Sequence, residues 1–427
     1  MIFLYFIILN AVLLLAMPFI FGRSLSDKKF RKDIKERLSG EINAPDMDKS
    51  LWIHASSVGE TRVALTLWKA LEKIDGIPPL VLSTFTESSY QLAIQENLKP
   101  VFRLPPDHPI WINPLIKKLN PSILILIESE FWPCLLWRCA KLKIPVLLAN
   151  GRISERSYQR YSKVARLFRK FIEPISFFAM RSQTDTDRIV NLGISKTKTE
   201  TIGNIKFDAS TILDQSQLLN NELTDLNLTV FGSTRPGEEE TILQSIKELR
   251  KKHSTAKFAL APRHINRRSE IENLFSKYDL PFTLQSEAKI NFSNATSIIQ
   301  TYIEPGGTVL VDTLGDLNDY YKISNLAFVG GGFNPEFGGQ NILEPAALGK
   351  PVIFGPHMKN FEEEAKLLSS GGGGIQLDNI DRLTETIDFL MNNKKKRATM
   401  GSTALKLVES KRGALKRHIQ KIIEIIS

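Results

Sequence analysis

The stretch LWIHASSVGETR, Leu51 to Arg62, joins an apolar run to a polar turn and then to a helical pattern. The run from Leu51 to Ala55 is typical of a buried strand, and Glu60 lies where the following helix begins. A carboxylate at this junction has two interpretations. It can face the free N–H groups of a helix N-terminus, or it can serve chemistry at the end of a strand. The stretch alone leaves both open.

The same succession of a short apolar run and a longer amphipathic run recurs along the chain and restarts after a polar segment around 214–227. The predicted strands are 51–55, 80–83, 101–104, 122–127, 146–149 and 175–180, then 228–232, 257–261, 309–311, 326–329 and 351–354. This alternation predicts βαβ units with a parallel sheet in each half. We therefore expect an α/β protein with doubly wound domains at 23–213 and 214–427. The basic helical tail from Lys394 could pack on either domain.

Composition indicates a folded protein with an affinity for anions. Of its residues, 42% are hydrophobic and 24% are charged, a balance typical of globular proteins. With 427 residues, the chain is long enough to form two hydrophobic cores. Its net charge of +10 favours anionic partners. No basic-aromatic platform is evident, so we expect no nucleic-acid partner. The two cysteines, Cys134 and Cys139, are too few for a disulfide framework.

Residues 1–22 are predicted to form a membrane anchor. The segment from Ile2 to Phe21 is uncharged, and its roughly 20 residues are just enough to cross a bilayer. No basic start precedes it, as a cleaved signal peptide would require. Positive charges instead follow the segment, which predicts that the rest of the chain stays on the cytoplasmic face of the membrane. Whether the anchor spans the bilayer or lies in its interface is left open.

A glycine-rich segment, GGGFNPEFGGQNILEPAALGKPV, follows the predicted strand at 326–329. Glycines allow the backbone to approach a ligand closely, and ligands of open parallel sheets bind beyond the carboxyl ends of the strands. Asn341 and Glu344 would begin a short helix there, and a carboxylate can accept hydrogen bonds from both hydroxyls of a ribose. We therefore favour a ribonucleotide site over a glycine-rich turn with a capped helix. No P-loop motif occurs.

Three other loops after predicted strands could bind the same anionic ligand, because arginine and helix N-termini both bind phosphate. The alternative for each loop is an ordinary cap or a surface ion pair. The residues concerned are Pro262 and Arg263, then Leu314, Gly315 and Asp316, and finally Ser233, Thr234 and Arg235 at a predicted helix start.

Seven motifs, taken in order, resemble those of the 3-deoxy-D-manno-octulosonic acid (Kdo) transferases of Gram-negative lipopolysaccharide synthesis. They are HASSVGE, ESEFWP, NGRISERS, GNIKFD, APRH, DTLGDL and GGQNILEPAALGKPV. The resemblance extends from the anchor to about residue 364. It implies the GT-B fold, in which two Rossmann-like domains face a cleft. It also implies an inner-membrane enzyme that moves Kdo from CMP-Kdo to a hydroxyl of the lipid A precursor lipid IVA, with inversion, without a metal or other cofactor, releasing CMP.

The resemblance also assigns residue roles. Glu60 would be the general base, expected to be ionised at its helix start; Glu130 would help complete the cleft, and Lys206 would assist at the phosphate. The residues matched to the CMP-Kdo site are Pro262, Arg263, Leu314, Gly315, Asp316, Asn341, Ile342, Leu343 and Glu344. Structural alternatives are a helix cap for Glu130 and an interdomain ion pair for Lys206. Asp316, Gln340 and Gly332 depart from the family pattern of Glu, His and Ser.

The acceptor side is indicated by one basic amphipathic pattern. Residues 156–171, RSYQRYSKVARLFRKF, are predicted to form a helix whose cations suit the phosphates of a lipid and the inner-membrane surface. A solvated face over a core is the alternative. His54 is expected to pack at a strand end or to make a loop hydrogen bond, and His264 and His357 to lie near the donor.

Two other functions compete with this interpretation. Another GT-B enzyme, such as a UDP-sugar transferase or 2-epimerase, would share both domains and the glycine-rich loops but would not explain the anchor and its basic flank. A non-enzymatic, membrane-tethered anion-binding protein would explain the charge but not the ordered carboxylates at strand ends.

Overall fold

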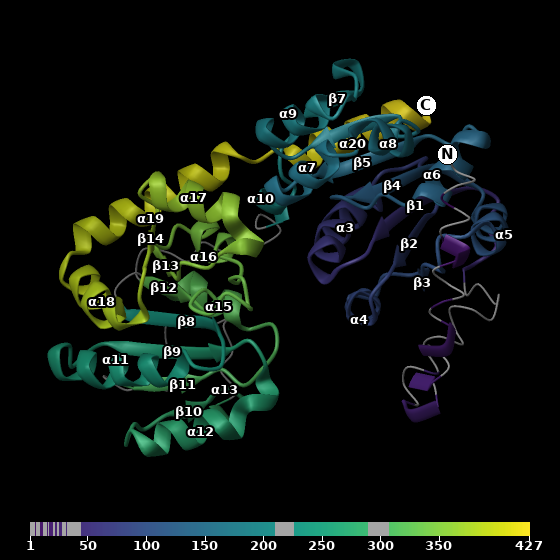
Figure 1. The fold of residues 1–427 in the computed structure, drawn as a ribbon. Coiled ribbons are helices and arrows are strands. Elements are labelled where there is room, and N and C mark those ends of the chain that lie inside the picture. The colour runs from purple at the N-terminus through teal and green to yellow at the C-terminus, as the bar shows by residue number, and fades with distance from the viewer. Residues whose placement is uncertain are drawn as a thin grey trace. The chain divides into compact units, whose positions relative to one another are not determined.

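The computed structural model describes residues 44–209, 226–288 and 307–427, together with scattered residues between 5 and 31. Nearly all of the predicted interdomain connection and most of the predicted anchor lie outside the described residues. The chain forms two compact units (Figure 1), the first made of residues 1–209 and 412–427 and the second of residues 210–411. No helix within the described residues has the length and apolar character needed to cross a bilayer.

The first unit is built on a seven-stranded sheet in which every pair of neighbours is parallel, with the order β3-β2-β1-β4-β5-β6-β7 (Figure 1). The strands are β1 (Ser50–Ala55), β2 (Leu80–Thr84), β3 (Val101–Arg103), β4 (Pro121–Ile127), β5 (Val146–Gly151), β6 (Phe177–Met180) and β7 (Thr199–Thr201). The predicted parallel α/β architecture of this half is therefore confirmed.

Helices cover both faces of this sheet, because successive strand side chains point to opposite faces. Trp52 packs into a core with α5, α6, α8 and α9, whereas Leu51 and Ile53 pack into a second core with α3, α4 and α20. The helices are α3 (Val58–Leu71), α4 (Glu87–Gln95), α5 (Pro109–Leu119), α6 (Pro133–Lys141), α7 (Glu155–Ser162), α8 (Ala165–Ile172), α9 (Gln183–Asn191), α10 (Lys206–Ala209) and α20 (Ala414–Ile426).

The second unit repeats this architecture. Its seven strands are also parallel and have the order β10-β11-β9-β8-β12-β13-β14. The strands are β8 (Leu228–Thr234), β9 (Lys257–Pro262), β10 (Thr283–Leu284), β11 (Thr308–Leu310), β12 (Leu326–Val329), β13 (Val352–Phe354) and β14 (Gly374–Gln376).

One face of this second sheet packs against α11, α12 and α18, with buried phenylalanines between the layers. Phe231, Phe258 and Phe328 project from adjacent strands into this core. The helices are α11 (Glu239–Lys252), α12 (Arg268–Lys277), α13 (Gln285–Ala288), α15 (Leu317–Ile323), α16 (Leu343–Ala347), α17 (Glu362–Ser370), α18 (Leu383–Asn392) and α19 (Lys394–Ser410).

Each sheet has one switch point at which the strand order reverses. In the first unit, β2 and β3 lie on one side of β1, and β4 and the later strands lie on its other side, so the order reverses between β1 and β4. In the second unit, the reversal lies between β8 and β12. Loops at such a point diverge and leave room for a ligand at the carboxyl ends of the strands.

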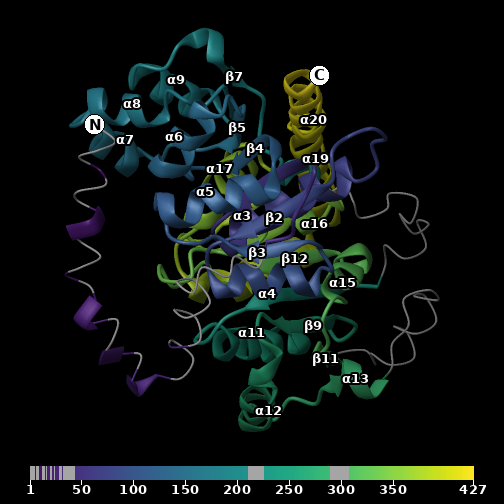
Figure 2. The same cartoon turned by 90° about the vertical axis from the view of Figure 1, so that its right-hand side faces the viewer.

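The end of the chain returns to the first unit as α20, which packs against α3 and β4 (Figure 2). The Asp208 carboxylate accepts hydrogen bonds from the N–H groups of Gly413 at 2.8 Å and Leu415 at 2.9 Å. On α20, the buried His418 accepts from the N–H of Asn150 at 3.0 Å, and burial lowers the pKa of this histidine to about 4. Two of the motif residues, Asn150 and Asp208, therefore hold this helix in place.

The structure corrects the predicted helix at 156–171. It consists of two helices, α7 and α8, that are separated at Lys163 and Val164. No residue of α7 is buried, whereas α8 buries Phe168 and Ile172. The break lets α8 pack by itself and lets Tyr161 stack on Phe168, with ring centroids 4.0 Å apart.

Candidate active site

The loops after β1 and β4 lie at the switch point of the first unit, because these two strands are neighbours in the sheet. Glu60 lies in the first turn of α3, which follows β1, and the loop after β4 carries Glu128 and Glu130. Glu128 has a φ of 61°, a left-handed conformation that is unusual for a residue other than glycine and is often found at functional sites. The switch point therefore brings together three carboxylates, one from the first turn of α3 and two from the loop after β4.

Glu60 completes a capping box at the start of α3. Its Oε2 accepts hydrogen bonds from the N–H groups of Ser56 at 2.7 Å and Ser57 at 3.3 Å. Its Oε1 accepts from the Ser57 hydroxyl at 2.9 Å. The helix-terminus interpretation of this carboxylate is thus correct, and the cap also fixes its position. A carboxylate offers about four acceptor sites, so a further hydrogen bond to a substrate can still form.

Glu130 is held by side chains rather than by a helix end. Its Oε2 accepts hydrogen bonds from the Ser56 hydroxyl and from the indole N–H of Trp132 at 2.9 Å, and lies 3.7 Å from Nε2 of His54. The alternative role as a helix cap is wrong, because α6 has Trp132 at its N-cap position and no side-chain cap hydrogen bond.

The surroundings shift the pKa values of these two glutamates in opposite directions. Burial raises the pKa of Glu60 to about 7, and the negative charge of Glu130 contributes to this rise. Burial also tends to raise the pKa of Glu130. The contact with His54 and the hydrogen bonds from Ser56 and Trp132 have a larger effect, so the pKa of Glu130 is lowered. Glu60 is therefore only about half ionised at pH 7, contrary to the expectation from its helix start. Two carboxyl groups with separated pKa values are typical of acid–base sites.

Ser56 connects the two carboxylates, a role that the sequence analysis missed. Its backbone N–H donates to Glu60 while its hydroxyl donates to Glu130. The buried His54 lies 3.1 Å from the Ser56 hydroxyl through Nε2 and 2.8 Å from the Ser83 hydroxyl through Nδ1. The two serines of the HASS motif were the sequence signal for this role. Their contacts could not be predicted, because Ser83 lies on β2 and Glu130 follows β4, and only the fold brings these residues to the motif.

Lys206 belongs to the same cluster. Its ammonium group lies 3.7 Å from Oε1 of Glu128, which follows β4 in the same unit. Glu128 in turn contributes to the raised pKa of Glu60. The structure thus places Glu60, Glu130 and Lys206 around one set of strand ends, and it gives Lys206 an ion-pair partner within the first unit.

In the second unit, the ends of β8 and β9 bring two of the predicted anion-binding segments side by side. Pro262 is the last residue of β9, and the N–H of Arg263 donates to the carbonyl of Thr234 at 3.0 Å. The predicted helix start at Ser233 and Thr234 is wrong, because both residues extend β8 and α11 begins only at Glu239. Ser233 has a φ of 55°, which bends the strand end before Arg235.

The predicted nucleotide-binding segments lie at helix starts as expected. Asn341 accepts a hydrogen bond from the N–H of Leu343 at 3.1 Å and donates to the Glu344 carboxylate at 2.9 Å. Ile342 and Leu343 are buried, so only their backbone can face a ligand. Asp316 precedes α15 and accepts from the Thr313 hydroxyl.

Leu314 and Gly315 occupy the exposed part of the loop before α15. The Leu314 side chain is 78% exposed, and Gly315 has a φ of 99° that other residues rarely adopt. An exposed leucine beside a glycine turn provides an apolar surface after β11.

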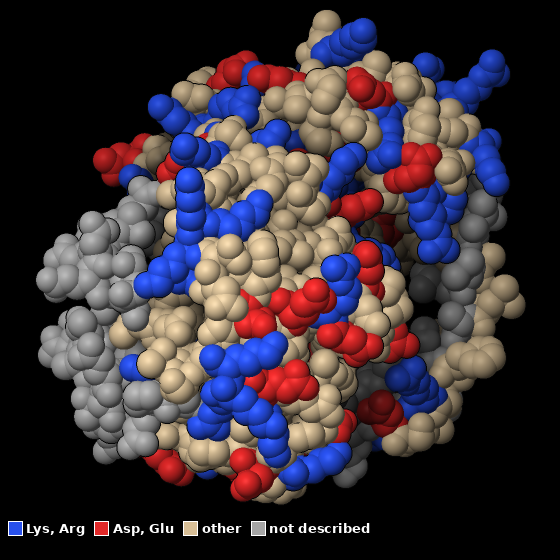
Figure 3. Space-filling view, turned by 90° about the vertical axis from the view of Figure 1, so that its left-hand side faces the viewer, with Lys and Arg blue, Asp and Glu red and all other residues tan. Residues whose placement is uncertain are grey.

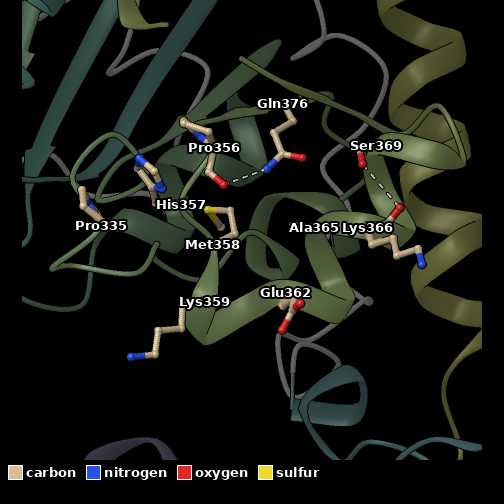
Figure 4. A pocket seen from close by; sticks show the side chains of 10 residues that line it. All are labelled: Pro335, Pro356, His357, Met358, Lys359, Glu362, Ala365, Lys366, Ser369 and Gln376. Atoms are coloured by element: carbon tan, nitrogen blue, oxygen red, sulfur yellow. Dashed lines mark hydrogen bonds between the residues drawn. The ribbon is translucent and has the colours of Figure 1, made fainter. Parts of the chain in front are cut away.

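A pocket of about 560 Å³ lies beside the glycine-rich segment (Figure 4). His357, Met358 and Gln376 line it, and the Gln376 amide donates to the carbonyl of Pro356 at 3.2 Å. The charged ends of Lys359 and Lys366 extend away from His357 (Figure 4). None of the residues matched to the CMP-Kdo site lines this pocket.

The excess positive charge does not form one continuous basic surface on the face shown in Figure 3, where Lys and Arg side chains are interspersed with Asp and Glu. Several of these cations in the second unit are ion-paired, for example Lys252 with Asp388 at 2.7 Å and Lys277 with Glu240.

Comparisons with known proteins identify the fold and the family. A family model described as 3-deoxy-D-manno-octulosonic-acid transferase (kdotransferase) matches residues 32–209. A 3-deoxy-D-manno-octulosonic acid transferase of Chlamydophila psittaci is 31% identical over 406 residues, which cover 93% of this chain and 90% of that protein. A bifunctional glycosyltransferase/methyltransferase of Fusobacterium nucleatum is 33% identical over 383 residues, which cover 87% of this chain but 57% of that protein.

A similar solved structure is UDP-GlcNAc 2-epimerase from Neisseria meningitidis bound to UDP-GlcNAc, with a TM-score of 0.56 and 15% identity over 88% of this chain and 100% of that one. At this identity the likeness concerns the fold, which is GT-B-like with two parallel-sheet α/β domains. The sequence relatives add the class of enzyme, a glycosyltransferase. The chain belongs to the 3-deoxy-D-manno-octulosonic acid (Kdo) transferase family. The family predicted from the seven motifs is confirmed.

Proposed function

We propose that the protein transfers Kdo from CMP-Kdo to a hydroxyl of the lipid A precursor lipid IVA, with inversion at the anomeric carbon. An acceptor hydroxyl oxygen forms a bond to this carbon while the bond from the carbon to the phosphate oxygen breaks. The hydroxyl proton passes to Glu60, and CMP leaves as a phosphate monoester. One base on the attacking face is sufficient for a single displacement, and no covalent glycosyl-enzyme is formed.

The observation that carries this proposal is the pair of carboxylates at the switch point of the first unit. A general base works best when its pKa lies near the working pH, and Glu60 meets this condition with a pKa of about 7. Glu130 stays ionised beside it, where its charge contributes to that value and would stabilise positive charge that develops on the sugar ring.

The donor is proposed to bind at the strand ends of the second unit. Glu344, fixed by Asn341, is suited to accept hydrogen bonds from the ribose hydroxyls of CMP. Arg263, beside the end of β8, is suited to the phosphate. We propose that arginine, lysine and backbone N–H groups supply the positive charge, and that the reaction needs no metal ion.

The acceptor and the membrane are proposed to meet the first unit at α7 and α8. Val164 and Leu167 are 50% and 42% exposed at the junction of these helices, and the exposed cations Arg160, Lys163 and Arg166 surround them in the sequence. Exposed apolar and basic side chains together suit the phosphates and acyl chains of a lipid at a membrane surface. We propose that residues 1–22 anchor the protein to the inner membrane, with both units on its cytoplasmic face.

One assay tests the proposed reaction. Purified protein, CMP-Kdo and a tetra-acylated lipid A precursor are incubated with EDTA, and the products are analysed by mass spectrometry. We expect CMP and a lipid heavier by one or more Kdo units, and the mass also counts the units added. An unchanged lipid under conditions in which the protein is folded and binds CMP would refute the acceptor. Activity that depends on added divalent cation would refute metal independence.

The pH dependence of the rate follows from Glu60. Because its pKa is raised to about 7 and the base must be ionised, kcat/KM should fall tenfold per pH unit below about pH 7. Glu130→Gln removes the neighbouring negative charge, so the pKa of Glu60 should drop and the acid limb should move to lower pH. The profile is measured between pH 5 and 9. An acid limb at the same pH in both proteins would show that another group controls it.

A further inference from the structure

At the switch point of the second unit, Arg235 has no carboxylate within ion-pair distance among the residues that the structure describes. It follows β8, and its Nη1 lies 2.6 Å from Nε2 of His264. Its guanidinium carbon lies 4.7 Å from the centre of the Phe337 ring, which belongs to the glycine-rich segment after β12. Its Nε is buried and has no hydrogen-bond partner within the described residues. A buried donor without a partner is costly, so a ligand that satisfies it is favoured.

The backbone around Arg235 is fixed by one carboxylate. Glu238 accepts hydrogen bonds from the N–H of Arg235 at 2.9 Å and from the N–H of Gly331 at 2.8 Å. Gly331 has a φ of 77°, and a Cβ there would lie 3.1 Å from Cγ of Gln340 and 3.5 Å from Cγ of Arg235. Glu238 thus joins the loop after β8 to the loop after β12 through backbone contacts, and the guanidinium is held in position before a ligand arrives.

His264 orients Arg235 without neutralising it. Burial lowers the pKa of His264, and the neighbouring Arg235, Arg263 and Arg267 lower it further. The imidazole is therefore neutral near pH 7 and accepts the hydrogen bond from Arg235. Arg267 differs from Arg235, because Arg267 forms ion pairs with Glu239 and Glu270, each at 2.7 Å. The positive charge of Arg235 is consequently not balanced by a carboxylate contact within the described residues.

Among the described parts of the chain, these contacts leave the edge of the guanidinium formed by Nε and Nη2 without a hydrogen-bond acceptor, so this edge can serve a ligand. That edge carries two parallel N–H groups that match the two oxygens of a carboxylate. The proposed donor has two anionic groups, a phosphate and the carboxylate of Kdo, and the sequence match gives the phosphate to Arg263. We propose that Arg235, held between Phe337 and His264, binds the carboxylate of the donor sugar. The inference rests on the proposed function, since it names which part of CMP-Kdo this residue recognises.

The test compares two ligands that differ in the sugar acid. Equilibrium dissociation constants are measured for CMP, which has the phosphate but no sugar carboxylate, and for CMP-Kdo. Arg235→Gln should weaken CMP-Kdo binding by about 10- to 100-fold, the effect of losing a charge-assisted pair of hydrogen bonds, and should change CMP binding by less than about threefold. Arg235→Lys keeps the charge but lacks the planar edge, so it should recover only part of the loss.

The matched control is Arg250→Gln, which removes the same charge from the far end of α11, about 16 Å along the helix from Glu239. It should leave both dissociation constants unchanged. Equal weakening of CMP and CMP-Kdo by Arg235→Gln would assign Arg235 to the phosphate and overturn the inference, as would unchanged binding of both. A wild-type protein that binds CMP but not CMP-Kdo would overturn the proposed function, and this inference with it.

Discussion

Replacing Glu60 with glutamine is expected to lower kcat by about 10²- to 10⁴-fold, the usual contribution of a general base. A glutamine amide cannot take the proton of the acceptor hydroxyl, whereas its oxygen can still accept the N–H groups of Ser56 and Ser57. Glutamine is also an accepted partner in a capping box, so α3 and the fold should be retained. CMP binding, which is proposed for the second unit, should not change. The measurements are single-turnover rates and CMP affinity.

The matched control for this variant is Glu87→Gln. Glu87 occupies the first turn of the neighbouring helix α4, where its carboxylate pairs with Arg103 at 2.8 Å. Glu87 is the same residue type at the same kind of helix position but lies outside the carboxylate cluster, so Glu87→Gln should leave turnover within about twofold of the wild type. If Glu60→Gln keeps more than a tenth of the wild-type rate, Glu60 is a helix cap and not the base.

The second large effect is expected on stability, at the helix that returns to the first unit. Ile422→Ala should lower the free energy of unfolding by about 2–5 kcal/mol, because it leaves a cavity in the core shared by β1, α3 and α20. Ile423, the adjacent residue, is 36% exposed, so Ile423→Ala should cost less than about 1 kcal/mol.

Tryptophan fluorescence during urea unfolding measures this effect in the correct unit. All five tryptophans of the chain, Trp52, Trp68, Trp111, Trp132 and Trp137, belong to the first unit. Equal losses for the two alanine variants would mean that α20 does not contribute its buried face to this core. A shift in the fluorescence midpoint for Ile422→Ala alone is the expected result.

The alternation of apolar and amphipathic runs was sufficient to predict both parallel sheets. The strands it missed, β7, β10 and β14, have only two or three residues and lie at the edges of the sheets, where few side chains are buried. The helix at 156–171 was predicted as continuous because its period is regular throughout. Its division at Lys163 and Val164 leaves no mark on this period, so only the structure reveals it.

The individual residues of the candidate site could be predicted from the sequence, but their spatial grouping could not. Motif spacing placed Glu60, Glu130 and Lys206 after strands, but their grouping depends on the reversal of strand order between β1 and β4. The raised pKa of Glu60 also needed the structure, because it results from burial and from Glu130, which is distant in the sequence. For the same reason the sequence indicated Arg235 but not its contact with Phe337, which comes from a loop about 100 residues later.

The position of α20 in the first unit has a consequence for biosynthesis. The ribosome makes β1 first, and it adds α20 only roughly 360 residues later, which at 5–20 residues per second takes about 20–70 s. During that time the surface that will receive Ile422 has no cover, while the second unit already has all its strands. The first half of the nascent chain should therefore be the last to reach its final packing, and should be the part that depends on chaperones.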